Sequence, residues 1–214
     1  MRRIFFIMAL SLLSLETWSQ SSSHTHYAIG FKLGSGMQTV TGSALSTIPR
    51  LAFCGGLWLQ LKLSQRWFMQ AELMNCAKGT GLGLHQARYG EYWLNLNYLE
   101  LPLLFQWHQR KGFVEFGPSA AALINSGEYI KGGALPYAVD KYPLNKRDFS
   151  FHFGVGCQLT EKWSVGVRLN HSIVPVRAQL PAANHSLYTR GISIHFLRQI
   201  KLMFKSHPSV TTEA

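Results

Sequence analysis

Apolar and polar residues alternate along most of this chain with a period of two. Residues 149–159 show it best: the odd positions are Phe, Phe, Phe, Val, Cys and Leu, and the even positions are Ser, His, Gly, Gly and Gln. Residues 51–63 and 163–170 alternate in the same way. Because successive side chains of a strand point to opposite faces, the pattern predicts strands with one apolar and one polar face.

Eight strands fit this alternation. We place them at residues 26–35, 50–63, 66–78, 92–107, 112–125, 148–159, 162–174 and 187–198. The fourth changes parity near Pro102, which predicts a bulge there. Short connections (Ser64–Gln65, His108–Lys111 and Thr160–Glu161) alternate with long ones (36–49, 79–91, 126–147 and 175–186). Bacterial outer-membrane barrels combine short periplasmic turns with longer extracellular loops in this way.

The apolar face decides between a membrane barrel and a soluble one. Charged residues make up only 14% of the chain, against about 25% in soluble domains, and the apolar face is almost free of them. We therefore predict an all-β, eight-stranded antiparallel up-and-down transmembrane β-barrel in the cell outer membrane. A soluble secreted barrel that binds a small apolar ligand is the first alternative.

The N-terminus has the features of a signal peptide. Arg2 and Arg3 precede a short apolar run, residues 4–13, and small residues follow near Ser19. A spanning helix needs about 20 apolar residues, so we expect cleavage of residues 1–19. The barrel domain would then cover residues 20–198, and a basic, polar tail residues 199–214.

The polar face of an eight-stranded barrel lines a lumen that side chains can fill, so we expect no open channel. Charges of both signs are expected to pair there, because unpaired buried charges are costly. The predicted lumen charge network, with a structural role, comprises Arg50, Lys62, Glu72, Lys78, Glu100, Glu115, Asp148 and Arg168; Lys32, His152 and Arg190 are further lumen candidates.

Cysteines and histidines give few signs of chemistry. Cys54 and Cys76 lie eleven residues on either side of Gln65, so symmetry makes them cross-strand neighbours that could form a disulfide. Ser193 and His195 share a strand face, but the last two strands contain no acid partner for a triad. We expect no catalytic, metal-binding or cofactor-binding residues and no cofactor. His24 and His26 could together bind a metal, but we favour the interpretation that they belong to an exposed polar segment before the first strand.

The net charge of +11 bears on partners. The basic residues are scattered and the chain carries an export signal, so nucleic acid is not expected as a partner. Attraction to outer-membrane lipid or lipopolysaccharide is the better interpretation. A barrel whose loops and lumen simply happen to be basic explains the charge equally well.

Several stretches resemble the PorT-like outer-membrane β-barrel family of Bacteroidetes. The most specific is Leu96–Leu104, with the sequence LNYLELPLL; others are Ala71-Glu72-Leu73 and Glu115-Phe116-Gly117-Pro118. The resemblance covers nearly the whole mature chain and implies an outer-membrane barrel without assigned enzymatic activity; one branch of the family takes part in type IX secretion. The chain departs from the family in continuing for eighteen residues after Phe196.

The sequence thus indicates a non-enzymatic outer-membrane barrel, an anchor or accessory factor for protein secretion or envelope structure. Its partners would bind extracellular loops, especially 126–147 with Tyr129, Tyr137 and Tyr142. A lipid A-modifying enzyme is the second alternative.

Overall fold

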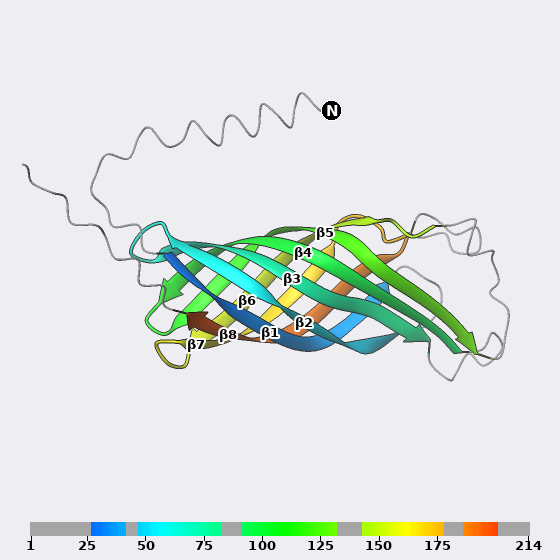
Figure 1. Cartoon of the computed structure of the whole chain (residues 1–214), viewed down its shortest axis with the longest axis horizontal. Helices are drawn as coiled ribbons and strands as arrows, with labels where there is room; N and C mark the ends of the chain where they lie inside the picture. The colour runs from blue at the N-terminus through cyan, green and yellow to red at the C-terminus, as the bar shows by residue number, and fades with distance from the viewer. Residues whose placement is uncertain (1–26, 42–46, 83–90, 132–142, 178–185, 201–214) are drawn as a thin grey trace, which may run out of the picture.

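The computed structural model describes residues 27–41, 47–82, 91–131, 143–177 and 186–200. Eight antiparallel strands form a closed barrel in which each strand pairs with its sequence neighbours and β1 pairs with β8 (Figure 1). The strands are β1 (Tyr27–Thr41), β2 (Thr47–Lys62), β3 (Trp67–Leu82), β4 (Glu91–Gln109), β5 (Gly112–Lys131), β6 (Arg147–Gln158), β7 (Trp163–Ser172) and β8 (Tyr188–Ile200). The predicted fold class is confirmed.

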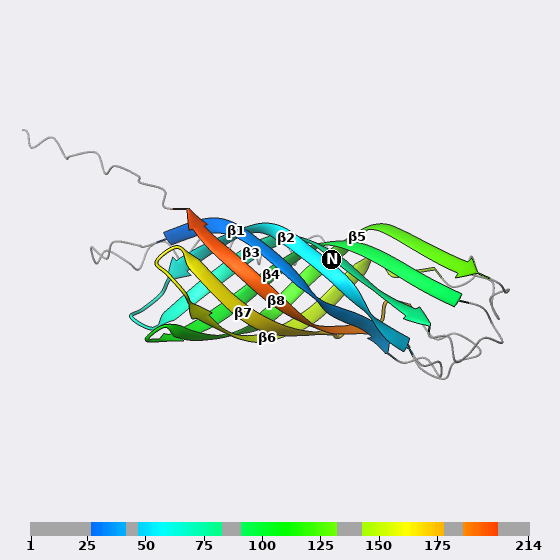
Figure 2. The ribbon, with the colours of Figure 1, turned by 90° about the horizontal axis from the view of Figure 1, so that it is seen from below.

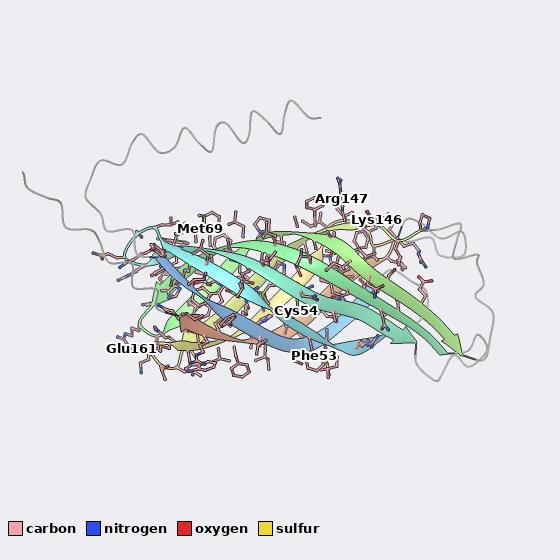
Figure 3. All side chains as sticks on the ribbon, viewed as in Figure 1. Phe53, Cys54, Met69, Lys146, Arg147 and Glu161 are labelled. Atoms are coloured by element: carbon pink, nitrogen blue, oxygen red, sulfur yellow. A yellow bond between two sulfur atoms is a disulfide. The ribbon has the colours of Figure 1, made fainter. Side chains whose placement is uncertain are left out.

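The two faces of each strand are separated as the alternation predicts. Phe151, Phe153 and Phe196 lie about half exposed on the outer surface, whereas inward-facing Glu115 and Arg168 are 4% and 3% exposed. Figure 3 shows the alternation at Phe53, which projects outward, and its neighbour Cys54, which lies inside. An apolar exterior around a polar interior is the arrangement that a barrel in lipid requires.

The two ends of the barrel differ. The end with the short connections, residues 63–66, 110–111 and 159–162, is called the turn end here; β1 begins and β8 ends there. At the opposite end, the loop end, β3, β4 and β5 reach farther than β6–β8 (Figures 1 and 2). None of the described residues forms a helix that could cross a membrane.

Strands at the loop end are longer than predicted. β1 continues to Thr41 and β2 begins at Thr47, so the connection expected at 36–49 narrows to residues 42–46. β3 and β5 continue to Leu82 and Lys131. Residues 126–131, Ser-Gly-Glu-Tyr-Ile-Lys, show that the sequence of such an extension lacks the regular alternation of apolar and polar residues.

The bulge predicted at Pro102 is not there. β4 keeps one parity throughout, with Tyr98, Pro102 and Leu104 all buried inside the barrel. The β4–β5 register instead shifts where Asn97 faces Asn125 and Tyr98 faces Leu123, which leaves Ile124 of β5 as the extra residue. The apparent change of parity arose because β4 is apolar on its inner face at the loop end.

That inner apolar face belongs to a hydrophobic cluster that fills the lumen at the loop end. The cluster comprises Val40, Leu94, Leu96, Tyr98, Ala121, Val176 and Leu187, with Leu123 and Leu144 packed against it. Val176 and Leu187 come from the segments that flank the β7–β8 connection, and a backbone hydrogen bond from Val176 N to Leu187 O joins them. The β7–β8 connection therefore contributes side chains that close the lumen.

Candidate functional site

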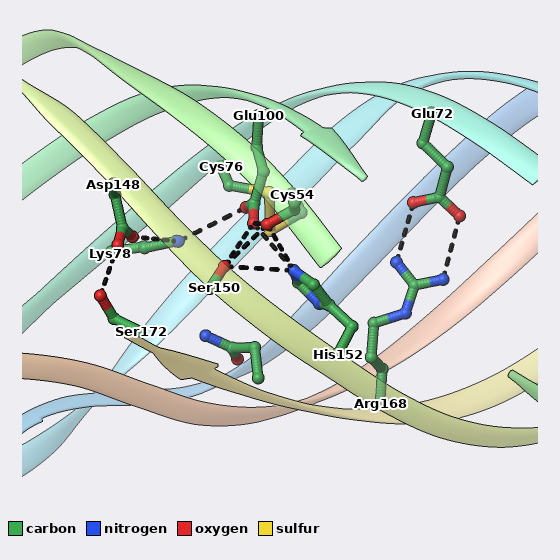
Figure 4. Close-up of polar contacts among 12 residues, drawn as sticks. Cys54, Glu72, Cys76, Lys78, Glu100, Asp148, Ser150, His152, Arg168 and Ser172 are labelled. Atoms are coloured by element: carbon green, nitrogen blue, oxygen red, sulfur yellow. Dashed lines mark hydrogen bonds and ion pairs between the residues drawn. A yellow bond between two sulfur atoms is a disulfide. The ribbon is translucent and has the colours of Figure 1, made fainter. Parts of the chain in front are cut away.

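The centre of the lumen holds an ion network built on Arg168 of β7. Its guanidinium donates two parallel hydrogen bonds to Glu72 of β3, at 2.8 and 2.9 Å (Figure 4). A third, from Nε to Glu115 of β5, measures 2.7 Å. Lys32 Nζ of β1 lies 2.7 Å from Glu72 Oε1. All four side chains are buried. Bidentate, charge-assisted pairs of this kind offset the cost of burying charge.

A second network lies toward the loop end, around Glu100 of β4. Lys78 Nζ sits between Asp148 Oδ2 at 3.1 Å and Glu100 Oε2 at 3.5 Å. Glu100 Oε1 also accepts a 2.7 Å hydrogen bond from Ser119 and lies 3.0 Å from His152 Nε2. Asp148 in turn accepts a hydrogen bond from Ser172 (Figure 4). Both carboxylates are thus paired with a cation and supported by hydroxyl donors.

Glutamine amides extend the central network toward the turn end. Gln70 donates a 2.6 Å hydrogen bond to Glu72, and Gln106 donates one of 3.0 Å to Glu115. Glycine makes room for these groups: a Cβ at Gly154 would lie only 2.7 Å from Glu115 Oε1. The Gly-rich inner face therefore lets large polar side chains meet across a narrow lumen.

Six of the eight residues that the sequence assigned to the lumen network lie in these two networks, and two do not. Lys62 is exposed at the turn end, because it is the last residue of β2. Arg50 is half-buried near the loop end, and no ion pair joins it to any residue in the described part of the chain. The additional lumen candidates Lys32 and His152 are both network members.

Arg190 is not a lumen residue, contrary to the sequence prediction. It is exposed on the outer face of β8, together with Ile192 and Ile194, while Ser193 and His195 face inward. The parity of the three apolar residues that follow, Ile192, Ile194 and Phe196, was the signal that could have placed Arg190 outside. The same signal finds the inward Gln70, Gln106, Ser119, Ser150 and Ser172, which the sequence reasoning missed.

Two described lumen histidines, His152 and His195, contact serine hydroxyls without the geometry of a triad. Ser193 Oγ lies 2.6 Å from His195 Nε2, but His195 Nδ1 has no hydrogen-bond partner among the described residues. His152 contacts Ser119 and Glu100 through the same Nε2 atom. A triad needs a base that bonds the hydroxyl with one nitrogen and the acid with the other. The described residues also include no group of three side chains suited to hold a metal; His24 and His26 lie outside them.

Among the described residues, the lumen opens as a cup at the turn end. The cup has a volume of about 430 Å³, and its lining includes Gln60, Gln106, His108 and Phe113. Deeper inside, a cavity of about 20 Å³ between His152 and Arg168 is the size of a single water molecule. Between this cup and the loop end, the two ion networks and the apolar cluster occupy the described part of the lumen.

Cys54 and Cys76 face each other in the β2–β3 register and form a disulfide inside the barrel. The bond lies beside the β2–β3 irregularity, since regular pairing is interrupted between Pro49 and Cys54. Cys157 is a free cysteine on the exposed outer face of β6.

We expect the double variant C54S/C76S to lose about 3 kcal/mol of unfolding free energy, because closing a loop of 22 residues restricts the unfolded chain by that amount. Urea unfolding in lipid vesicles under non-reducing conditions measures it. C157S, which removes an exposed thiol without a bond, is the matched control and should unfold like the wild type. Equal stability of C54S/C76S and C157S would contradict the prediction.

The sequence carries a family signature that agrees with this architecture. The family model described as "Outer membrane protein beta-barrel domain" matches residues 18–177. The chain belongs to this family. It is an outer-membrane protein, and its apolar outer face is the lipid-facing surface. Comparison with curated proteins gives no significant match.

Solved structures of bacterial outer-membrane proteins share the fold at low sequence identity. Neisserial surface protein A (NspA) superposes with a TM-score of 0.51 at 6% identity, over 82% of this chain and 99% of that one. Ail of Yersinia pestis gives 0.43 at 7% identity over 82% and 99%, and OprG of Pseudomonas aeruginosa gives 0.41 at 9% identity over 81% and 97%. At these identities the likeness concerns the fold alone.

The alternative of a soluble secreted barrel is wrong. Family membership places the chain in the outer membrane, and the structure turns its large apolar side chains outward rather than around an internal ligand cavity. A soluble barrel of this size would reverse the two faces.

Proposed function

We propose that this protein is a non-enzymatic outer-membrane barrel that anchors or assists other envelope components, such as a protein-secretion machinery. The observation that carries the proposal is the filled lumen. Two ion networks and an apolar cluster occupy the interior, so transport through the barrel has no structural support. We therefore place the contacts with partners on the surfaces of the barrel.

The loop end is the surface that we assign to partners. Bacterial barrels place short turns in the periplasm and longer loops outside the cell, so we infer that the loop end is extracellular. There β3–β5 project beyond the rest of the barrel and form a raised edge (Figure 2). The tyrosines proposed as contacts lie at or next to this edge in sequence: Tyr129 is in β5, although its side chain is not described, and Tyr137 and Tyr142 lie outside the described residues.

Secretion is named because one branch of the PorT-like family of Bacteroidetes, which this chain resembles, takes part in type IX secretion. The most specific block of this resemblance, Leu96–Leu104, runs through the middle of β4, where Glu100 organises the second ion network. The position of this block fits the construction of the lumen rather than a binding surface. The block therefore supports shared architecture, while the secretion role itself needs a test in cells.

A deletion strain of the source bacterium tests the role. We expect loss of the gene to leave secreted proteins in the periplasm or to weaken the envelope, while the lipid A mass spectrum stays unchanged. Complementation by a variant lacking residues 132–142 should fail, and a variant with residues 42–46 replaced by Gly and Ser serves as the loop control. Normal secretion and envelope integrity in the deletion strain would exclude the role, and altered lipid A would indicate an enzyme.

We also expect the purified barrel to give no steady ion conductance in planar lipid bilayers, because the lumen is filled. Single-channel recording measures this, with bilayers lacking protein as the reference. Stable, reproducible current steps from the folded protein would show that a conducting path exists.

A further inference from the structure

Charge in this barrel is segregated between inside and outside. In the lumen ion pairs of the described residues, five carboxylates, Glu72, Glu100, Glu115, Glu128 and Asp148, meet four cations, Lys32, Lys78, Arg168 and Arg177. The interior is therefore close to neutral, although the whole chain has a net charge of +11. Among the carboxylates whose side chains the structure describes, only Glu161, in a turn, is exposed. Of the other Lys and Arg residues whose side chains are described, all but the half-buried Arg50 are exposed.

Part of this charge gathers on the outer wall of β6–β8 near the loop end. Arg147 begins β6, Lys146 precedes it, and both are exposed. His171 of β7 and Arg190 of β8 are exposed cross-strand partners. The outermost of these strands are two spacings apart, about 10 Å, and Arg147 lies four residues, about 13 Å, nearer the loop end than Phe151, which faces His171. Arg147 and Arg190 can therefore contact separate phosphate groups of one large ligand. Figure 3 shows Arg147 projecting away from the barrel.

The cationic cluster lies at the upper border of the lipid-facing surface. Phe151 is the cross-strand partner of His171, and Phe149 and Ile192 lie one alternate position farther from the loop end than Arg147 and Arg190 respectively. These three side chains are about half exposed and apolar. On β6 and β8 the outer face changes from apolar to cationic toward the loop end, whereas exposed Ile173 follows His171 after β7. The cations therefore lie close to the level where hydrocarbon gives way to headgroups.

We propose that Lys146, Arg147, His171 and Arg190 bind the phosphate groups of lipopolysaccharide in the outer leaflet. Guanidinium groups bind phosphate oxygens in a bidentate manner, and no described carboxylate on this wall competes for them. The site faces sideways into the membrane, so the ligand is a lipid headgroup rather than a soluble partner. The proposal rests on the outer-membrane location and the inferred orientation of the loop end, and it is independent of any role in secretion.

Binding of defined lipids to the detergent-solubilised full-length barrel, measured by native mass spectrometry, tests the site. The probes are lipid A with two phosphates, enzymatically dephosphorylated lipid A, and inorganic phosphate. We expect R147Q/R190Q to bind phosphorylated lipid A at least about tenfold more weakly than the wild type, since one lost charge-assisted contact already has that effect. R147K/R190K should keep part of the affinity. The matched control is R110Q/K111Q, which removes two exposed cations at the turn end.

Folding of each variant is checked by its heat-modifiable migration on a gel, so a loss of binding by an unfolded barrel is not counted. The site is supported if only R147Q/R190Q loses lipid A and dephosphorylated lipid A binds weakly to the wild type. Equal losses in R147Q/R190Q and R110Q/K111Q would overturn it, because binding would then follow net charge alone. Equal binding of dephosphorylated lipid A, or equally tight binding of inorganic phosphate, would also overturn it.

Discussion

Replacing Arg168 by Met is expected to destabilise the barrel by about 3–5 kcal/mol, the range found when one partner of a buried ion pair is removed. Arg168 is 3% exposed and is hydrogen-bonded to both Glu72 and Glu115. Without it, Glu72 keeps its contact with Lys32, but Glu115 loses its cationic partner. The cost therefore comes mainly from one carboxylate left charged in a site that excludes water.

A second substitution separates charge imbalance from lost packing. In R168M/E115Q the remaining lumen charges of this network, Lys32 and Glu72, still pair, so we expect more than half of the lost stability to return. Equilibrium unfolding in urea, in vesicles of fixed composition, measures all three proteins. R190M removes an arginine from the outer face and should change stability by less than about 0.5 kcal/mol. If R168M were no less stable than R190M, the central network would have no structural role.

The alternation of the sequence predicted the barrel because lipid and lumen impose opposite demands on alternate residues. That constraint holds only across the membrane. Above it both faces of a strand meet water or protein, so β5, predicted to end at residue 125, runs on to Lys131 without a period-two signal. The same reason explains Leu94 and Leu96, which face a protein cluster inside the loop end and look like lipid-facing residues in the sequence.

Contacts could be predicted where adjacent strands set the register. A short turn joins β2 to β3, so equal counting from Gln65 placed Cys54 opposite Cys76. Arg168 and Glu72 lie on β7 and β3, which are not neighbours in the barrel. Their pairing depends on how all eight strands are staggered, which no local pattern reveals. The sequence therefore predicted which charged residues face the lumen better than it predicted which of them form ion pairs.

An arginine introduced on the lipid-facing wall should have the second large effect on the stability of the barrel. Phe153 lies on β6, about half exposed and in the middle of the apolar surface, where it pairs with Phe116 and Leu169. We expect F153R to lower the free energy of unfolding in lipid bilayers by about 2–4 kcal/mol, the cost of an arginine at the bilayer midplane. Leu63 is equally exposed but lies beside the first turn. L63R should cost only about 0–1 kcal/mol, because its guanidinium reaches the headgroups.

The comparison of F153R with L63R separates the membrane from the barrel itself. Both substitutions introduce the same charge at an exposed position, L63R beside a turn and F153R within a strand. In water they would therefore change the free energy of unfolding by similar and small amounts. In vesicles the difference between them should grow to about 2 kcal/mol or more, and it should shrink when the same proteins are unfolded from detergent micelles, which deform around a charge. Urea or guanidinium titrations in both media give the four values. Equal stabilities of F153R and L63R in vesicles would mean that hydrocarbon does not contact the wall around Phe153, and the assignment of the outer face to lipid would then fail.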